Sequence, residues 1–260
     1  DFMDGDIKKK KITKADNNKL KSVEESGSEI KKVGKDYTDN YSNSTSGTDV
    51  IVIKKFTQSV IDSGQASNIL TTRTWKLEEQ QHNINAGLRL GNMLGKKLKV
   101  RAEEKNTKFT RLDSGKIDKR LIASLGFGAE RIFAQISTDK YNPANVHISI
   151  DASGSMGGAK WDRTQVAAIA IAKAASMISN INVQISYRTT QNGIPLVLIA
   201  YDSRTDKITK IRNLFKHINA GGLTPEGLCF EAIKDIMVES SVNMDSYFIN
   251  FSDGEPYCAP

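Results

Sequence analysis

The spacing of hydrophobic and polar positions changes partway along the chain. Between residues 50 and 125, apolar side chains recur every three or four positions, which is typical of amphipathic helices. From about residue 131, short apolar runs alternate with longer segments of helical spacing. The short runs at 131–136, 146–150, 182–188, 195–201 and 247–251 predict strands, and the segments at 160–179, 206–218 and about 227–238 predict helices.

This alternation predicts a three-layer α/β fold, doubly wound around a mostly parallel sheet. The dipeptide Asn192-Gly193 between two predicted strands indicates a tight hairpin turn. The helix at 160–179 is rich in alanine, so it can lie close against a sheet. We therefore place the α/β domain at residues 129–260 and a helical segment at residues 49–128.

Residues 1–48 have a different composition. They contain the run Lys8–Lys11, mixed charge throughout and a polar stretch at 38–47, but few branched apolar residues. Such a segment buries too little apolar surface to offset the conformational entropy lost on ordering. We expect a disordered charged tail or linker there.

The net charge of +7 is concentrated in one segment. Residues 71–120 hold 13 basic and 6 acidic side chains, with Lys96, Lys97, Lys99 and Arg101 at their centre. A patch of this kind can meet nucleic acid or an acidic protein surface. Because no aromatic residues interleave these basic ones, we prefer the interpretation of a solvated helix face and keep nucleic-acid binding as an alternative.

The cysteine content and the hydropathy of the chain indicate the subcellular compartment that we expect. The two cysteines, Cys229 and Cys258, are too few for a disulfide framework and fit a reducing, cytoplasmic setting. The sequence has no run of 18 apolar residues, so a membrane span is not indicated. We expect no membrane partner.

The candidate chemistry begins at Asp151, directly after the predicted strand at 146–150. The block Asp151-Ala-Ser153-Gly-Ser155 places one carboxylate and two hydroxyls at a turn between a strand and a helix. Hard oxygen ligands of this kind suit a small divalent cation such as Mg²⁺. Taken alone, however, the block can also be an ordinary helix cap.

Two later segments strengthen the metal interpretation. Thr224 sits in a glycine-rich loop before Pro225, and Asp253 follows the last predicted strand. In a doubly wound sheet, ligands bind beyond the carboxyl ends of the strands, where the strand order reverses. If the strands before Asp151 and Asp253 flank that point, two carboxylates and three hydroxyls converge and leave a coordination position open for water or an outside ligand.

These segments resemble the von Willebrand factor A domain, whose metal-ion-dependent adhesion site uses an Asp-x-Ser-x-Ser block, a later Thr and a later Asp. Within this family, the chain is most similar to the A domain of cobaltochelatase T subunits. The matching stretches are Gly115–Asp118, Asp151–Met156, Gly221–Gly227 and Ser252–Pro256.

The resemblance implies a site for Mg²⁺ or Mn²⁺ formed by Asp151, Ser153, Ser155, Thr224 and Asp253. It also implies a partner protein that supplies a Glu or Asp to the metal, and an AAA+ ATPase partner in metal insertion or protein remodelling. No catalysis by this chain alone is expected. Because a domain of this type is expected to continue with further helices and strands, the resemblance predicts that residues 129–260 are incomplete at their carboxyl end.

Other functions remain as alternatives. A stand-alone adhesion or scaffold protein would use the same metal site. A serine hydrolase would use Ser155, but the Gly-x-Ser-x-Gly pattern is absent because Ser153 lies two positions before it, and His217 is the only later histidine. We interpret His82 and His147 as structural, since neither has metal-ligand spacing.

Overall fold

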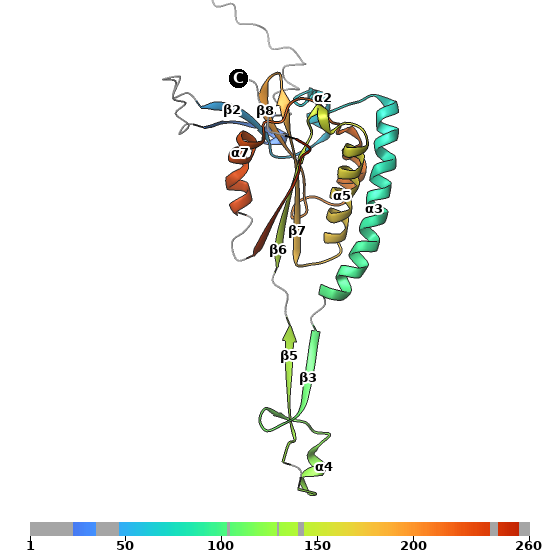
Figure 1. Ribbon diagram of the computed structural model, residues 1–260, viewed down its shortest axis with the longest axis vertical. Coiled ribbons are helices and arrows are strands. Elements are labelled where there is room, and N and C mark those ends of the chain that lie inside the picture. Colours follow the sequence, from blue (N-terminus) through green and yellow to red (C-terminus); the bar gives the residue numbers. More distant parts are fainter. Residues whose placement is uncertain are drawn as a thin grey trace, which may run out of the picture.

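A six-stranded sheet forms the centre of the molecule (Figure 1). The computed structural model describes residues 23–34, 47–102, 105–128, 130–139, 143–239 and 244–254. The sheet has the order β1-β2-β8-β7-β6-β9; the pairs β2–β8, β7–β6 and β6–β9 are parallel, and the other two are antiparallel. The predicted α/β class with a mostly parallel sheet is therefore confirmed. Its strands are β1 (Glu29–Val33), β2 (Thr48–Ile53), β6 (Ala144–Asp151), β7 (Ile181–Gln191), β8 (Ile194–Asp202) and β9 (Asp245–Phe251).

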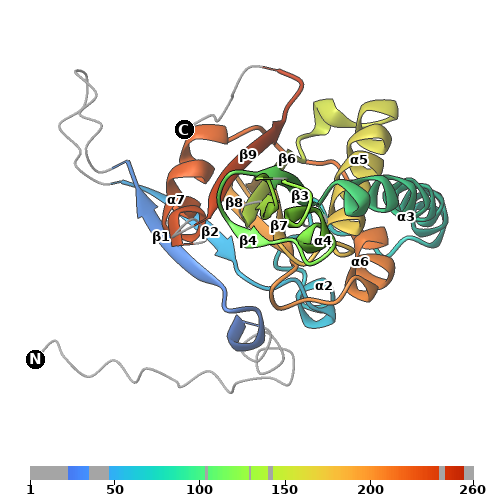
Figure 2. The same cartoon turned by 90° about the horizontal axis from the view of Figure 1, so that it is seen from below.

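Helices cover both faces of this sheet (Figures 1 and 2). On one face α7 packs over β1, β2 and β8, and on the other face α5 lies against the sheet with α3 outside it. The larger core lies on the α5 side, where Ile148, Ile150 and Ile169 are fully buried. The helices are α2 (Gln58–Ser63), α3 (Thr74–Ala102), α5 (Ala159–Ala175), α6 (Thr209–Leu214) and α7 (Glu226–Glu239), with short 3-10 helices η1 (Gly154–Met156) and η2 (Phe215–His217).

Glycine and alanine allow α3 to approach α5 closely. Gly87, Gly91 and Gly95 recur at four-residue spacing along α3 and therefore share one face of the helix. A Cβ atom at Gly91 would lie 2.7 Å from the carbonyl oxygen of Ala170 and 2.6 Å from Cβ of Lys173. These glycines are required by the close helix contact, and their spacing in the sequence is the signal that predicts it.

The sheet extends further toward the amino terminus than the sequence analysis expected. β1 lies within the segment assigned to the tail, and β2 opens the segment assigned to helices. Val50 and Val52 of β2 are fully buried and pack with Val33 of β1 against α7. The run Val50-Ile51-Val52-Ile53 is β-branched throughout, which favours a strand buried on both faces. The rest of the expected tail lies outside the described residues.

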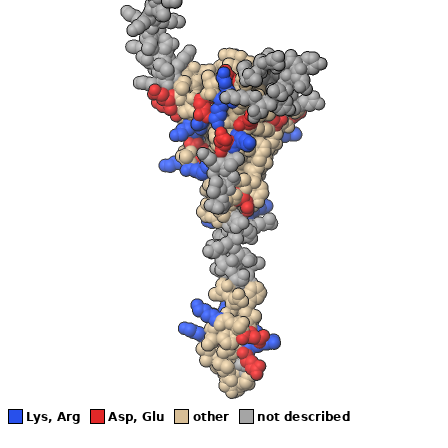
Figure 3. Space-filling model, turned by 90° about the vertical axis from the view of Figure 1, so that its left-hand side faces the viewer, with Lys and Arg blue, Asp and Glu red and all other residues tan. Residues whose placement is uncertain are grey.

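A small second sheet projects from the main body as an arm formed by residues 105–139 (Figures 1 and 3). Its strands have the order β3-β5-β4, and Lys and Arg side chains flank it in Figure 3. The sequence predicted a boundary between the helical segment and the α/β domain at residue 128. The arm extends past this boundary, because β5 pairs with β3 and β4 and not with β6. The apolar side chain of Phe127 is 92% exposed. The elements of the arm are β3 (Lys105–Leu112), β4 (Lys116–Ile117), α4 (Ile122–Leu125) and β5 (Phe133–Asp139).

The hairpin turn, the basic cluster of α3 and Cys229 lie within the described residues. β7 and β8 form the predicted hairpin, with positive φ angles of 53° at Asn192 and 82° at Gly193. Lys96, Lys97 and Lys99 are exposed near the end of α3. Cys229 is buried in α7, whereas Cys258 lies outside the described residues. Of the helices described, none combines the length and apolar character that crossing a membrane requires.

Candidate metal-binding site

Asp151 is the last residue of β6, and its carboxylate lies in the interior. The residue is 0% exposed. Its Oδ1 accepts the backbone N–H of Ser153 at 2.8 Å, and its Oδ2 accepts the hydroxyl of Ser252 at 3.2 Å. Because a buried carboxylate is costly without donors, these two bonds hold it in place at the carboxyl end of the strand.

Ser153, Ser155 and Asp253 form a hydrogen-bonded chain. The hydroxyl of Ser155 donates to Oδ1 of Asp253 at 2.9 Å, so it accepts from the hydroxyl of Ser153, 3.0 Å away. β6 and β9 are parallel neighbours, which brings the residues after both strands to the same edge of the sheet. The first and last parts of the sequence motif therefore meet in the fold.

The loop that carries Thr224 is bonded to the Asp151 block through the backbone. The N–H of Gly154 donates to the carbonyl of Gly222 at 3.0 Å, and the N–H of Gly221 donates to the carbonyl of Ala152 at 2.6 Å. Gly222 has a φ of 93°, and a Cβ there would lie 2.3 Å from the hydroxyl oxygen of Thr189. Only glycine fits this close approach. Thr224 itself is 8% exposed.

Two cations face the two carboxylates. The ammonium of Lys160 lies 2.6 Å from Oδ2 of Asp253, and this bond holds the pKa of the Asp253 carboxyl below its ordinary value. Arg188, paired with Asp151 in the β6–β7 register, is 1% exposed. Burial lowers the pKa of the Arg188 guanidinium, whereas the charges of Asp151 and Glu226 oppose that effect. Lys160 and Arg188 therefore offset part of the negative charge of Asp151, Asp253 and Glu226, and one formal negative charge is left among these five side chains.

Arg188 is held by a buried polar cluster. It donates to the hydroxyl of Ser149 at 2.9 Å and to Oε1 of Glu226 at 3.0 Å, and it lies over the ring of Phe230 with 5.1 Å between its Cζ and the ring centroid. Glu226 also accepts the side-chain amide of Asn250. This cluster links β6, β7, β9 and the start of α7 directly behind Asp151.

The structure thus joins Ser153, Ser155 and Asp253 through side-chain hydrogen bonds. Asp151 is joined to them through the backbone N–H of Ser153 and the hydroxyl of Ser252, and the Thr224 loop through backbone bonds. Lys160, Arg188 and the hydroxyl of Ser252 were not predicted as parts of the site. A charged residue within the strand 182–188 is a signal for Arg188, because a charge in a buried strand needs a partner. Lys160 has no comparable signal, since a lysine in a first helical turn is ordinarily solvated.

The contacts of Ser155 and His217 bear on the hydrolase alternative. The hydroxyl of Ser155 bonds Ser153 and Asp253, while Nδ1 of His217 lies 2.9 Å from the carbonyl oxygen of Thr71. A serine nucleophile needs a base within hydrogen-bonding reach. His217 is engaged elsewhere, so the described residues do not assemble that pair.

Comparisons with known proteins add no family assignment. Neither the models of known protein families nor the curated protein sequences gave a match to this chain. Within the described part of the chain, no three or more His, Cys, Asp or Glu residues group as metal ligands. The candidate site consists of two carboxylates and neutral hydroxyls, a different type of donor set.

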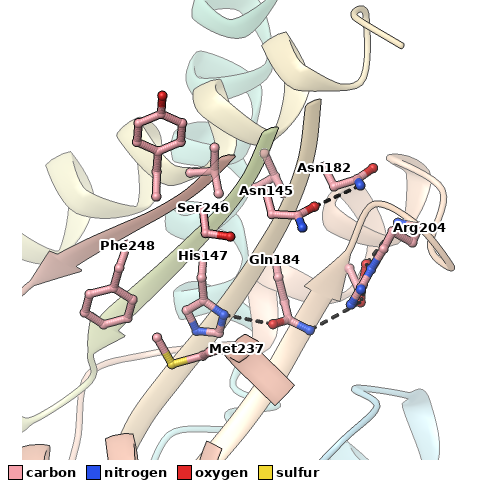
Figure 4. A pocket seen from close by; sticks show the side chains of 12 residues that line it. Asn145, His147, Asn182, Gln184, Arg204, Met237, Ser246 and Phe248 are labelled. Atoms are coloured by element: carbon pink, nitrogen blue, oxygen red, sulfur yellow. Dashed lines mark hydrogen bonds and ion pairs between the residues drawn. The ribbon is translucent and has the colours of Figure 1, made fainter. Parts of the chain in front are cut away.

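A second polar cluster lies near the opposite end of β6 and β7, beside a cavity of about 80 Å³ (Figure 4). The ring of His147 bonds Oε1 of Gln184 through Nδ1 and the hydroxyl of Ser186 through Nε2, both at 2.8 Å. Gln184 in turn donates to Asp202, which is paired with Arg204. Since Oε1 of Gln184 can only accept, Nδ1 of His147 carries a proton. Burial lowers the pKa of His147 to about 4, so the imidazole is neutral at pH 7. This supports the structural interpretation of His147.

The buried His147 makes stability depend on pH. Burial lowers the pKa of His147 to about 4, below its ordinary value of 6.5. Between these values the unfolded chain binds more protons, so the free energy of unfolding falls as pH falls, by about 3 kcal/mol from neutral pH to pH 4. Urea unfolding across this range measures it. His147→Gln should flatten that part of the profile, and His82→Gln, at an exposed position, should not. A wild-type profile that the His147 substitution leaves unchanged would contradict the prediction.

Proposed function

We propose that this chain contains a von Willebrand factor A-type domain that binds Mg²⁺ or Mn²⁺ and docks a partner protein through the bound cation. The observation that carries the proposal is the direct bond from Ser155 to Asp253, beside the buried carboxylate of Asp151. The Asp151 block, the Thr224 loop and Asp253 are distant from one another in the sequence. Their meeting at one sheet edge favours a site over an isolated helix cap.

The sheet topology supports this location. β6 has β7 on one side and β9 on the other, so the strand order reverses around β6. Asp151 ends β6, and Asp253 follows β9 by two residues. Ligands of open α/β sheets bind in the crevice beyond the carboxyl ends of such strands. Asp151 and Asp253 lie at the carboxyl ends of two such neighbouring strands.

The donor set fits a hard divalent cation. Asp151 and Asp253 supply carboxylate oxygens, and Ser153, Ser155 and Thr224 supply hydroxyl oxygens, with no sulfur or nitrogen among them. These are the ligand types that Mg²⁺ and Mn²⁺ prefer. The position of the Lys160 ammonium on Asp253 also supports a site that attracts cations. When bound, the cation supplies an open coordination position for an acidic side chain of the partner.

Hydrogen bonds within the chain orient the proposed ligands. The Ser153 N–H and the Ser252 hydroxyl orient Asp151, and the backbone bonds of Gly154 and Gly221 fix the Thr224 loop. The resemblance to cobaltochelatase T subunits suggests an AAA+ ATPase as the partner, with this chain as a non-catalytic subunit in metal insertion or remodelling. A stand-alone adhesion module would use the same site.

Removal of divalent metal tests the proposal. Mg²⁺ binds only the folded state, so it should raise the free energy of unfolding by about 2.7 kcal/mol at a free concentration of about 100 times its Kd. Thermal unfolding with Mg²⁺, Mn²⁺ or EDTA measures this, and calorimetric titration gives the Kd. The chain can also be co-expressed with an AAA+ ATPase from the organism that encodes it. The two proteins should co-elute in Mg²⁺ and separate in EDTA. Equal stability in Mg²⁺ and EDTA would refute a metal site.

A further inference from the structure

Lys160 lies where it can oppose the cation that the site is proposed to bind. It is the second residue of α5, and its ammonium lies 2.6 Å from Oδ2 of Asp253. Oδ1 of the same carboxylate accepts the Ser155 hydroxyl at 2.9 Å. Both oxygens of Asp253 are therefore engaged by groups of the chain. A divalent cation that bound Asp253 would therefore be repelled by the ammonium already paired with that carboxylate.

The two cations beside the site differ in their freedom to move. Arg188, behind Asp151, is 1% exposed and is held by Ser149 and Glu226. The side chain of Lys160 is 61% exposed, whereas that of Asp253 is 10% exposed. A lysine side chain has four rotatable bonds and a strongly hydrated head, so it can swing into solvent at little cost. Of these two cations, Lys160 is the one that can leave.

We propose that Lys160 is a built-in competitor for the divalent cation: it neutralises Asp253 in the metal-free protein and must leave that carboxylate for the cation to bind. Lys160 thereby sets the affinity of the site. This inference rests on the proposed metal-binding function and deepens it. The ion pair is solvent-facing and therefore weak, so a divalent cation can displace it. In the metal-free protein, the Asp253 carboxylate therefore keeps a positively charged partner.

The test compares Mg²⁺ affinity among matched variants of the whole chain, by calorimetric titration and by electron paramagnetic resonance with Mn²⁺. Lys160→Gln removes the competing charge and should tighten binding about three- to tenfold. Lys160→Arg keeps the charge and should stay within about twofold of wild type. Arg163→Gln removes an exposed charge from the next turn of α5 and should also stay within about twofold, because screening weakens distant surface charges.

Thermal unfolding separates competition from a purely structural role. In EDTA, Lys160→Gln loses an ion pair, and its Tm should fall by about 1–2 °C. The increase of Tm on adding Mg²⁺ should be larger than in wild type. A lysine that only stabilised the fold would lower Tm equally with and without Mg²⁺. Unchanged or weaker Mg²⁺ binding in Lys160→Gln overturns this inference alone, whereas absence of binding in wild type and all variants overturns the proposed function and the inference with it.

Discussion

Asp151→Asn should abolish Mg²⁺-dependent stabilisation and weaken Mg²⁺ binding roughly 100-fold or more. Loss of a group that merely supports a metal ligand costs about 10- to 100-fold in affinity, and Asp151 is proposed as a ligand itself. The substitution keeps the size of the side chain and an oxygen that can accept the Ser153 N–H. It removes the negative charge and replaces one oxygen by an NH₂ group, which cannot accept the Ser252 hydroxyl. Calorimetric titration with Mg²⁺ measures the effect on affinity, and co-elution with the ATPase measures the effect on docking.

Asp245→Asn is the matched control for this experiment. Asp245 is exposed at the first position of β9, at the opposite end of the strand from Asp253. The control removes the same charge and should bind Mg²⁺ as wild type does. Thermal unfolding in EDTA shows whether each variant is folded. If folded Asp151→Asn bound Mg²⁺ as tightly as the control, Asp151 would not be a ligand.

Arg188→Met should lower the free energy of unfolding by about 3 to 5 kcal/mol. Removing one partner of a buried ion pair leaves the other charge without compensation. Here the group left behind is the Glu226 carboxylate, and the buried Asp151 loses its neighbouring positive charge. Methionine fills the space of the aliphatic stem but does not reach the position of the guanidinium over Phe230, so the lost volume adds to the cost of the lost charge. Urea unfolding in EDTA, without any metal contribution, measures the change.

A second substitution distinguishes charge from packing. In Arg188→Met with Glu226→Gln, the uncompensated carboxylate is gone, and part of the lost stability should return. Arg212→Met, at an exposed position of α6, should change stability by less than about 0.5 kcal/mol. A loss in Arg188→Met no larger than in Arg212→Met would show that the buried cluster does not stabilise the fold.

The central part of the fold could be predicted because local patterns and tertiary structure agree there. β6 to β9 are apolar runs bounded by polar turns, and α5 is an alanine-rich helix, so spacing alone located them. The contact between the Asp151 block and Asp253 followed from the same pattern, since neighbouring parallel strands present their carboxyl ends at one edge. The hairpin at Asn192 and Gly193 was likewise encoded locally by residues that adopt positive φ.

The parts that escaped prediction depend on distant partners. β1 has the sequence Glu-Ile-Lys-Lys-Val, in which only Val33 is buried, and it becomes a strand because Val33 is covered by α7, more than 190 residues later. β5 has a strand pattern, but its pattern could not show that β3 and β4, not β6, would be its neighbours. Lys160 was missed for a similar reason: its importance comes from Asp253, 93 residues away.

The separation in sequence between the site residues affects when the site forms. The bonds from Ser155 to Asp253 and from Ser252 to Asp151 close loops of 98 and 101 residues. Loop closure over such distances opposes early contact, and parallel pairing of β6 with β9 is among the slow steps of folding. We therefore expect the carboxylates to meet only after most of the sheet has assembled. The cation that we propose for this site would then act on the finished fold, retarding its unfolding without guiding its formation.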